Sequence, residues 1–189
     1  MPGEVVSTAE DAVEVAGRLG YPVVLKMVSP GLSHKTEVGG VRLDLATDEE
    51  VLAGYNEIVV SAADLTLDGL RVERYHPGLE VIVGGIVDDS FGPLVSIGLG
   101  GVLTELLDDV VFAPAPVGLE DAAEMIDRLR GRRLLDGYRG SPPADVPELA
   151  QLLSIVSRRL VGAGIKEVEI NPLIWDGEEW VAVDWLWST

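Results

Sequence analysis

Residues 20–41 read GYPVVLKMVSPGLSHKTEVGGV. The part from Tyr21 to Val28 is short, apolar and rich in β-branched residues, which predicts a buried strand. Residues 29–40 then hold one proline, three glycines and two serines without a helical period. They predict a loop, and a loop this long in a compact domain is often functional. Val41 to Leu45 alternates apolar and polar residues, so it predicts a half-buried strand.

Helices and strands are predicted on both sides of this stretch. Start and stop signals with a helical period predict helices from a Ser7–Glu10 capping box to Gly20, from Thr47 to about Ala63, over Leu119–Leu129, and from Asp145 to about Val161. Apolar runs predict strands over Leu70–Tyr75, Glu80–Val87, Pro93–Ile97, Val110–Phe112, Lys166–Ile170, Leu173–Trp175 and Trp180–Asp184. Because the helices and strands do not alternate regularly, the class is α+β or α/β without a doubly wound sheet.

The composition excludes several classes of function. The 189 residues include 14 Lys and Arg against 32 Asp and Glu, a net charge of −18. Such acidity argues against nucleic acid and against anionic membrane surfaces, which both attract clustered cations. The absence of cysteine excludes disulfides, thiolate metal sites and cysteine nucleophiles. With no apolar run long enough to span a membrane and no signal segment, we expect a cytoplasmic protein.

A metal site is indicated near the end of the chain. Glu169 and Asn171 lie two residues apart in an extended segment, so their side chains share a face. Asp184 follows an apolar strand on the far side of a predicted hairpin. Carboxylate and amide oxygens suit Mg²⁺, which usually keeps waters and substrate phosphates among its ligands. The alternative is structural: Asn171 makes a turn with Pro172, and Asp184 is a surface charge.

Two features could bind phosphate. Lys26 lies in an apolar strand, where its ammonium suits a phosphate; alternatively it reaches solvent from a strand edge. Gly98-Leu99-Gly100-Gly101 could offer backbone N–H groups to a phosphate. The pattern is not a P-loop, because no Lys-Ser or Lys-Thr follows, and glycine-rich loops are common.

The chain has two histidines. His34 lies in the long loop, where a neutral imidazole can accept and pass on a phosphoryl group, or simply make one hydrogen bond. His76 stands beside Pro77 in a tight turn, which favours a structural role. The basic cluster at positions 128, 130, 132, 133 and 139 is either a solvated helix end or an anion contact.

Taken together, the chain resembles the ATP-grasp domain of the NDP-forming acyl-CoA synthetases. This is the succinyl-CoA synthetase superfamily, in the branch containing ADP-forming acetyl-CoA synthetase. The resemblance covers nearly the whole chain, in family order. It rests on GYPVVLK (20–26), SPGLSHKTEVGGV (29–41), VERYHPGLEVIVG (72–84), FGPLVSIGLGGVLTELLDDVVF (91–112), LLDGYRGSPPAD (134–145), EINPL (169–173) and VAVD (181–184).

The resemblance implies two α+β lobes with ATP between them, a smaller lobe over 1–76 and a larger one over 77–189. It places Lys26 on the nucleotide phosphates, Glu73 at the hinge beside the adenine and Glu80 near the ribose. The phosphate-facing glycines would be Gly100 and Gly101, followed by Glu105.

The same resemblance makes Asn171 and Asp184 ligands of Mg²⁺, with Glu169 close by. His34 would be the histidine that carries phosphate to ADP or from ATP. The acyl-CoA would react with phosphate on a CoA-binding, Rossmann-like domain or subunit, which this chain lacks. The resulting acyl phosphate would then feed a phosphohistidine relay that ends at His34.

Three departures from the family pattern keep a second interpretation open. The helix and strand that normally precede Glu4 are missing, Ala113 replaces a usual Arg, and Trp185 follows Asp184 where the family often has Ala. The alternative is a ligand-sensing, regulatory module without turnover, associated with a protein acetyltransferase or a partner synthetase subunit. A third possibility is a purely structural subunit. It depends on the four tryptophans near the end of the chain, which form either a packed hairpin or a docking surface.

Overall fold

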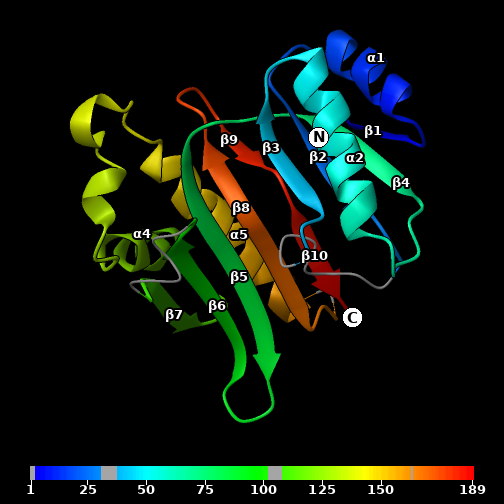
Figure 1. The fold of residues 1–189 in the computed structure, drawn as a ribbon. Coiled ribbons are helices and arrows are strands. Elements are labelled where there is room, and N and C mark those ends of the chain that lie inside the picture. Colours follow the sequence, from blue (N-terminus) through cyan, green and yellow to red (C-terminus); the bar gives the residue numbers. More distant parts are fainter. Residues whose placement is uncertain (1–2, 31–37, 102–107, 163) are drawn as a thin grey trace. The chain divides into compact units, whose positions relative to one another are not determined.

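The structure, a computed structural model, describes residues 3–30, 38–101, 108–162 and 164–189 (Figure 1). The chain divides into two units, Met1–Tyr75 and His76–Thr189, and each has its own hydrophobic core. Both units combine one antiparallel sheet with helices, which is the α+β class. None of the helices among the described residues is long and apolar enough to cross a membrane.

The first unit is a four-stranded sheet in the order β1-β4-β2-β3, covered by two helices (Figure 1). Its core joins apolar residues of the sheet to the inner faces of both helices, with Leu25, Met27, Ile58 and Leu70 fully buried. The elements are β1 (Gly3–Val6), α1 (Ala9–Leu19), β2 (Val23–Val28), β3 (Val41–Leu45), α2 (Asp48–Ser61) and β4 (Gly69–Arg74).

Local signals explain both helices of this unit. Thr47 caps α2 as expected, because its side chain accepts a hydrogen bond from the N–H of Glu50. The predicted cap of α1 was one residue early: Thr8, not Ser7, accepts from the N–H of Asp11 at 3.1 Å. β1 was not predicted, because four residues at a sheet edge carry little periodicity of their own.

The second unit contains a larger sheet in the order β10-β8-β5-β6-β7, with β9 also paired to β8 (Figure 1). Helix α5 packs on β5, β6 and β8, and α4 packs on α5 and β7. The elements are β5 (Leu79–Asp88), β6 (Gly92–Leu99), β7 (Val110–Pro114), α4 (Leu119–Asp127), α5 (Val146–Gly162), β8 (Glu167–Trp175), β9 (Trp180–Ala182) and β10 (Trp185–Ser188), with 3₁₀ turns at Arg132–Leu134 and Tyr138–Gly140.

The end of the chain differs from the prediction. β8 is continuous through Asn171, where two separate strands were expected. The last predicted strand ends at Ala182, and β10 then pairs with the first half of β8. Proline lacks an N–H, so Pro172 suggested a break; here its carbonyl oxygen accepts from the N–H of Val183, and pairing continues.

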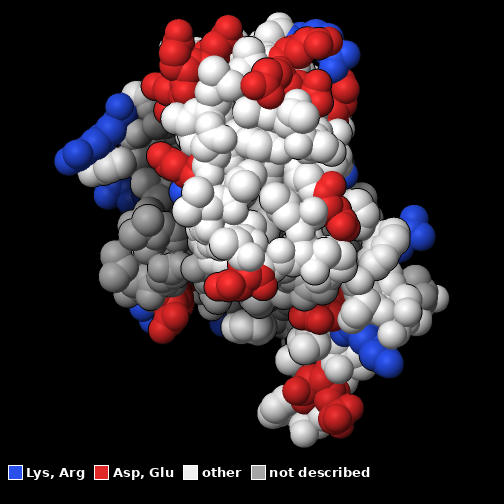
Figure 2. Space-filling view, turned by 45° about the vertical axis from the view of Figure 1, so that its right-hand side comes forward, with Lys and Arg blue, Asp and Glu red and all other residues white. Residues whose placement is uncertain are grey.

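Acidic side chains outnumber basic ones over the sequence by 32 to 14. On the face that Figure 2 presents, they form several separate groups, and the basic side chains lie mostly toward the margins. Acidic residues also fill the first turns of α1 and α2, where a carboxylate favours the helix dipole. Part of the acidity therefore supports local structure.

Candidate functional site

Within the first unit, the structure brings Lys26 and Glu73 together. Lys26 lies on β2 and Glu73 on the neighbouring strand β4, two residues along from the position opposite Lys26. The ammonium nitrogen Nζ is 2.8 Å from Oε2 of Glu73, and the two side chains are only 11% and 7% exposed. The carboxylate therefore compensates the cost of burying the ammonium. This explains how an apolar strand can hold a lysine.

This pairing gives Glu73 a side-chain role that the sequence did not indicate. Its other oxygen, Oε1, lies 3.9 Å from Nη1 of Arg71 on the same strand. Beyond Glu73 the strand end is also occupied, because the N–H of Tyr75 donates to the carbonyl oxygen of Pro22. The expected contact of this strand end with adenine stays a prediction.

Within the second unit, Glu80 and the glycines at the end of β6 lie side by side. The N–H of Gly100 donates to the carbonyl oxygen of Glu80 at 2.7 Å. A Cβ on Gly100 would lie 2.6 Å from Cβ of Glu80, so only glycine fits there. A Cβ on Gly101 would lie 3.1 Å from Oε2 of Glu80, and its φ of +69° also favours glycine. The carboxylate of Glu80 thus lies beside the glycine backbone.

Burial alters the acidity of this carboxyl group. Glu80 is half-buried, and its burial raises the pKa above the ordinary value of a glutamic acid. β5 also pairs with β8, where Glu80 stands opposite Ile174. The groups expected at the ribose and at the metal therefore lie on neighbouring strands of one sheet.

The backbone brings the three expected metal ligands close together where β9 passes into β10. Nδ2 of Asn171 donates to Oε1 of Glu169 at 2.8 Å, so these two side chains share a face as predicted. The backbone N–H of Asn171 donates to the carbonyl oxygen of Asp184 at 3.0 Å, which places Asp184 directly across from it. Oδ1 of Asp184 accepts from the N–H of Trp185.

The donor chemistry of this group suits Mg²⁺. Two carboxylates and one amide oxygen are hard ligands, and both Asn171 and Asp184 are exposed, which leaves room for waters and phosphate oxygens. Within the described ranges, no group of three or more His, Cys, Asp or Glu side chains is placed to hold a metal ion by itself. A metal here would thus need the amide oxygen of Asn171 and ligands from the substrate.

Two predicted site residues lie outside the described residues. These are His34, which belongs to the segment between β2 and β3, and Glu105, which follows Gly101. Two surface hollows on the described part of the chain, of about 400 and 290 Å³, include none of the predicted residues. The first is lined by Arg42, Asn56, Glu57, Val60 and Ser61, and the second by Leu119, Ala123, Val146, Pro147, Ala150 and Gln151.

Asp109 is a residue that sequence reasoning missed. It is 3% exposed, and its two carboxylate oxygens accept from the backbone N–H groups of Arg130 and Gly131, each at 2.8 Å. Its carbonyl oxygen accepts from the N–H of Leu99 at the end of β6. Asp109 therefore joins the arginine-rich segment to the strand that ends in the glycines. A single acid next to another, Asp108, gives no sequence signal for such a role.

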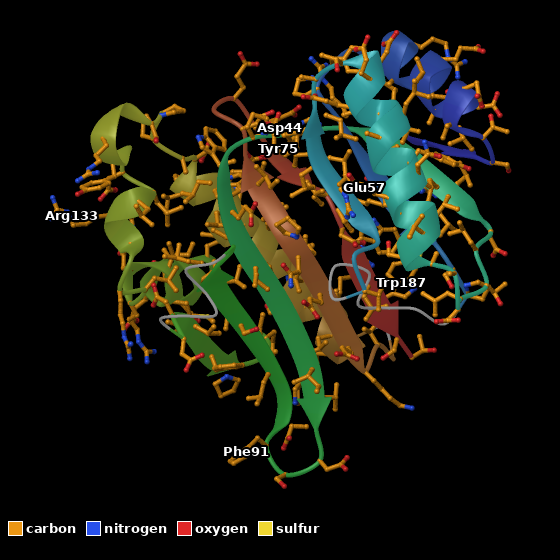
Figure 3. The ribbon with its side chains drawn as sticks, viewed as in Figure 1. Asp44, Glu57, Tyr75, Phe91, Arg133 and Trp187 are labelled. Carbon is orange, nitrogen blue, oxygen red and sulfur yellow. The ribbon has the colours of Figure 1, made fainter. Side chains whose placement is uncertain are left out.

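Both the basic cluster and the four tryptophans contain some members that are paired or buried and others that are exposed to solvent. Arg132 pairs with Asp127 at 2.9 Å and Asp136 at 2.7 Å, whereas Arg133 is exposed (Figure 3). Trp175 and Trp180 are buried with ring centres 5.4 Å apart. The other two, Trp185 and Trp187 on β10, are 58% and 61% exposed and meet edge to face.

Comparison with known proteins identifies the class. The ATP-grasp domain matches residues 1–186, nearly the whole chain, and the chain therefore belongs to the ATP-grasp domain family. The expected α+β, ATP-grasp fold is thus confirmed. Within the family, the chain is 41% identical to the beta subunit of acetate–CoA ligase (ADP-forming) I from Pyrococcus furiosus, over 96% of this chain and 81% of that subunit.

A longer relative is 4-hydroxybutyrate–CoA ligase (ADP-forming) of Nitrosopumilus maritimus. It is 36% identical over 87% of this chain, which spans only 24% of that protein. The relatives that match the chain thus include separate beta subunits and long single-chain ligases.

Solved structures agree in fold. A dinucleotide-forming acetyl-coenzyme A synthetase from Candidatus Korarchaeum cryptofilum has a TM-score of 0.86 and 37% identity, covering 97% of this chain and 83% of the other. That enzyme was also solved with coenzyme A and Mg-AMPPCP, its phosphohistidine segment pointing towards the nucleotide binding site (TM-score 0.75, 38% identity, 96% of this chain and 82% of the other). A Pyrococcus horikoshii protein has a TM-score of 0.82 and 35% identity, covering 98% of this chain and 82% of the other.

Proposed function

We propose that this chain is the ATP-binding module of an ADP-forming acyl-CoA ligase, and that it transfers a phosphoryl group between His34 and the nucleotide. The observation that supports it most is that the side chains of Glu169 and Asn171 contact each other while the backbone of Asp184 pairs with that of Asn171. This arrangement supplies oxygen ligands for Mg²⁺ in a chain whose relatives carry the names of ADP-forming acyl-CoA ligases.

Two groups of residues bind the nucleotide in this proposal. The ammonium of Lys26 binds the phosphates as a point charge, while Glu73 holds its position on the sheet. In the second unit, Gly100 and Gly101 form the phosphate-facing segment, and Glu80, against which both glycines pack, accepts from the ribose hydroxyls.

Mg²⁺, when bound, neutralises the negative charge of the phosphates. Asp184 and Asn171 offer it oxygen ligands, and Glu169 orients the amide of Asn171 through their hydrogen bond. With only Lys26 as a cation among the predicted nucleotide-binding residues, affinity depends strongly on the metal and the backbone. We therefore expect nucleotide binding to weaken sharply without Mg²⁺.

The reaction is a phosphoryl transfer. In the direction of ATP synthesis, the bond between phosphorus and the His34 nitrogen breaks, and a bond forms from phosphorus to a terminal oxygen of ADP. The ring nitrogen keeps the electron pair of the broken bond and the ring takes up a proton from water, which leaves the imidazole neutral and ready for the next phosphoryl group. Since phosphoryl transfer offers little covalent work to the protein, positioning and charge neutralisation carry the catalysis.

A partner supplies the phosphoryl group in this proposal. A CoA-binding, Rossmann-like domain or subunit converts an acyl-CoA and phosphate into an acyl phosphate, and a histidine of that partner passes the phosphoryl group on to His34. The beta-subunit relatives support the need for a partner. The acyl group is recognised on that partner, away from this chain.

The test uses the two histidines as matched variants. Incubation with ATP labelled on its γ-phosphate and Mg²⁺ should leave acid-labile phosphate on the wild type and on His76→Ala, but none on His34→Ala. His76 is a fair control because it lies in a turn, 3.6 Å from Asp176. Equal labelling of both variants would contradict the proposal.

Calorimetry separates the enzyme from the regulatory alternative. The enzyme should bind ATP in the presence of Mg²⁺. A chain that gives no heat with ATP and Mg²⁺ but responds to acyl-CoA would instead favour a ligand-sensing module.

A further inference from the structure

Backbone hydrogen bonds fix both ends of the segment that would carry His34 to the sheet of the first unit. Its first end continues β2, whose last residue, Val28, accepts at its carbonyl oxygen from the N–H of Asp68. At the other end, the carbonyl oxygen of Gly40 accepts from the N–H of Met27 at 2.8 Å. The two ends therefore meet at one end of the paired strands β2 and β3, where residues 28 and 40 leave and rejoin the sheet.

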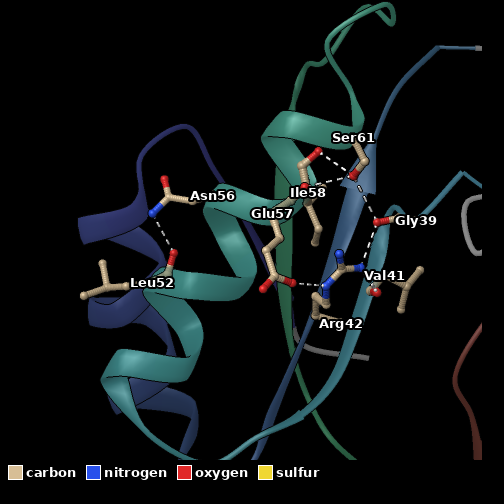
Figure 4. Close-up of polar contacts among 8 residues, drawn as sticks. All are labelled: Gly39, Val41, Arg42, Leu52, Asn56, Glu57, Ile58 and Ser61. Carbon is tan, nitrogen blue, oxygen red and sulfur yellow. Dashed lines mark hydrogen bonds and ion pairs between the residues drawn. The ribbon is translucent and has the colours of Figure 1, made fainter.

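An arginine of the sheet binds the second end of this segment on the side that faces helix α2. Nη1 of Arg42, on β3, donates to the carbonyl oxygens of Gly39 and Val41, each at 2.9 Å. Its Nε donates to Oε2 of Glu57, on α2, at 2.7 Å. Figure 4 shows the guanidinium lying between the helix and the carbonyl oxygen of Gly39.

Helix α2 is adapted to this contact. Gly54 is buried inside the helix, where glycine normally lowers helix stability. A Cβ at Gly54 would lie 3.4 Å from Cγ of Arg42 and 3.3 Å from Cδ1 of Leu45, so glycine gives the arginine stem its space. Ser61, one turn beyond Glu57, offers its hydroxyl proton to the carbonyl oxygens of Gly39, Glu57 or Ile58.

The geometry favours arginine over lysine at this position. The bonds to Glu57 and to Gly39 leave from two different nitrogens of one rigid plane, whereas lysine has a single nitrogen. Because the donor is charged, each bond is stronger than one between neutral groups. Gly39 has a φ of +70°, so the chain turns at the residue that Arg42 holds.

From these contacts, we infer that Arg42, fixed by Glu57, is a positioning residue for phosphoryl transfer at His34. By holding the carbonyl oxygen of Gly39, it fixes the residues that follow the His34 segment, 38–40, beside β3. The inference rests on the proposed function, since it takes His34 as the phosphoryl carrier. In this inference Arg42 acts through the backbone of Gly39 and not by direct contact with the nucleotide.

The test compares two arginine variants in the same unit. Arg42→Met keeps the aliphatic stem beside Gly54 but removes the guanidinium. Arg18→Met is the matched control, because Arg18 also forms a 2.8 Å ion pair, with Glu4, away from the segment. At saturating ATP, the single-turnover rate of His34 labelling should fall about tenfold in Arg42→Met, the size expected for losing a charge-assisted hydrogen bond. It should not change in Arg18→Met.

Further measurements separate positioning from a general loss of structure. The dissociation constant for ATP should be the same in both variants and the wild type. Arg42→Lys keeps the positive charge beside Glu57, so its free energy of unfolding should be close to that of the wild type. Its labelling rate should still be as low as that of Arg42→Met. Cleavage by trypsin after Lys35 should be faster in Arg42→Met than in Arg18→Met.

The contrary results are distinct. Wild-type labelling and cleavage rates in Arg42→Met would overturn the inference and leave the proposed function standing. So would a labelling rate that falls only in step with ATP affinity. A wild type that carries no phosphate on His34 would overturn the proposed function, and this inference with it.

Discussion

The ammonium of Lys26 lies 2.8 Å from the carboxylate of Glu73, and both side chains are almost fully buried in the sheet of the first unit. Breaking such a pair by removing one partner is costly, because the remaining charge stays buried. Replacing both partners is much less costly. The pair therefore allows the structural and nucleotide-binding roles of Lys26 to be measured separately.

Lys26→Met should lower the free energy of unfolding by about 3 kcal/mol, because the Glu73 carboxylate loses its main partner. The double variant Lys26→Met/Glu73→Gln should recover most of this loss, yet bind ATP about tenfold or more weakly. Urea unfolding followed by far-ultraviolet circular dichroism measures the first effect, and calorimetry the second. A double variant with wild-type ATP affinity would exclude Lys26 from the phosphate site.

Gly100→Ala should destabilise the second unit by about 2 kcal/mol, the usual cost of forcing an extra carbon into a packed place. The new Cβ would lie 2.6 Å from Cβ of Glu80 and 2.9 Å from its carbonyl carbon. Tryptophan fluorescence during unfolding reports on this unit, which holds all four tryptophans. Gly162→Ala is the control, since nothing lies within 4 Å of its added carbon. Equal stability of the two variants would contradict the packing argument.

Stability should depend on pH through Glu80, because burial raises the pKa of its carboxyl group in the folded state. The folded chain then holds this proton more tightly than the unfolded chain, so stability falls as pH rises from the ordinary glutamate pKa through the raised one. Glu80→Gln should therefore be more stable than the wild type at neutral pH, and this advantage should vanish in acid. Urea unfolding over a pH series measures it. An advantage independent of pH would show that ionisation of Glu80 is not its cause.

Asp184→Asn should weaken Mg²⁺-dependent ATP binding by about tenfold or more, the size seen when groups that support a metal site are lost. ATP binding in the presence of a chelator should change little, because the carboxylate acts through the metal. Calorimetry with and without Mg²⁺ makes the comparison. Glu178→Gln is the control, because Glu178 is an exposed carboxylate in the turn between β8 and β9. Loss of affinity that is equal with and without the metal would argue against Asp184 as a ligand.

Asp109→Asn should lower the free energy of unfolding by about 2 kcal/mol, since an amide offers one acceptor oxygen where two backbone N–H groups need one each. Fluorescence-monitored unfolding tests this. The exposed Asp121, which accepts from the N–H of Gly118 at 3.2 Å, is the comparison, and Asp121→Asn should cost far less. Equal losses of unfolding free energy in the two variants would mean that the burial of Asp109 does not strengthen its hydrogen bonds.

Much of the fold could be predicted because its signals are local. Thr47 and the acidic turn after it mark the start of α2 whatever the rest of the chain does, and the apolar run ending at Val28 predicts β2. Pairing is not local, so the continuity of β8 through Pro172 was missed. Whether a proline ends a strand depends on what lies opposite, and here β9 and β10 continue the pairing on either side of it.

In the candidate site, too, local relationships could be predicted and contacts between distant residues could not. Asn171 and Glu169 share a face because strands alternate, which two letters of sequence suffice to predict. The partner of Lys26 could not be predicted, since Glu73 is far along the chain and only the pairing of β2 with β4 brings it near. Asp109 was missed for the same reason, since the backbone N–H groups that it binds lie 21 and 22 residues along the chain. Arg42 was missed because its partner Glu57 lies on another element, α2.

By itself, then, the sequence determined the kind of chemistry: oxygen ligands near its end, a lysine in an apolar strand, glycines where a strand stops and one histidine in a long loop. Residue type and short spacing are enough for that, because they decide charge, ligand character and backbone freedom. The tertiary structure alone decided which groups compensate one another. Glu73 meets Lys26, Glu57 fixes Arg42, and Asp109 holds the arginine segment, since hydrogen bonds depend on distances of a few ångströms between residues remote in sequence.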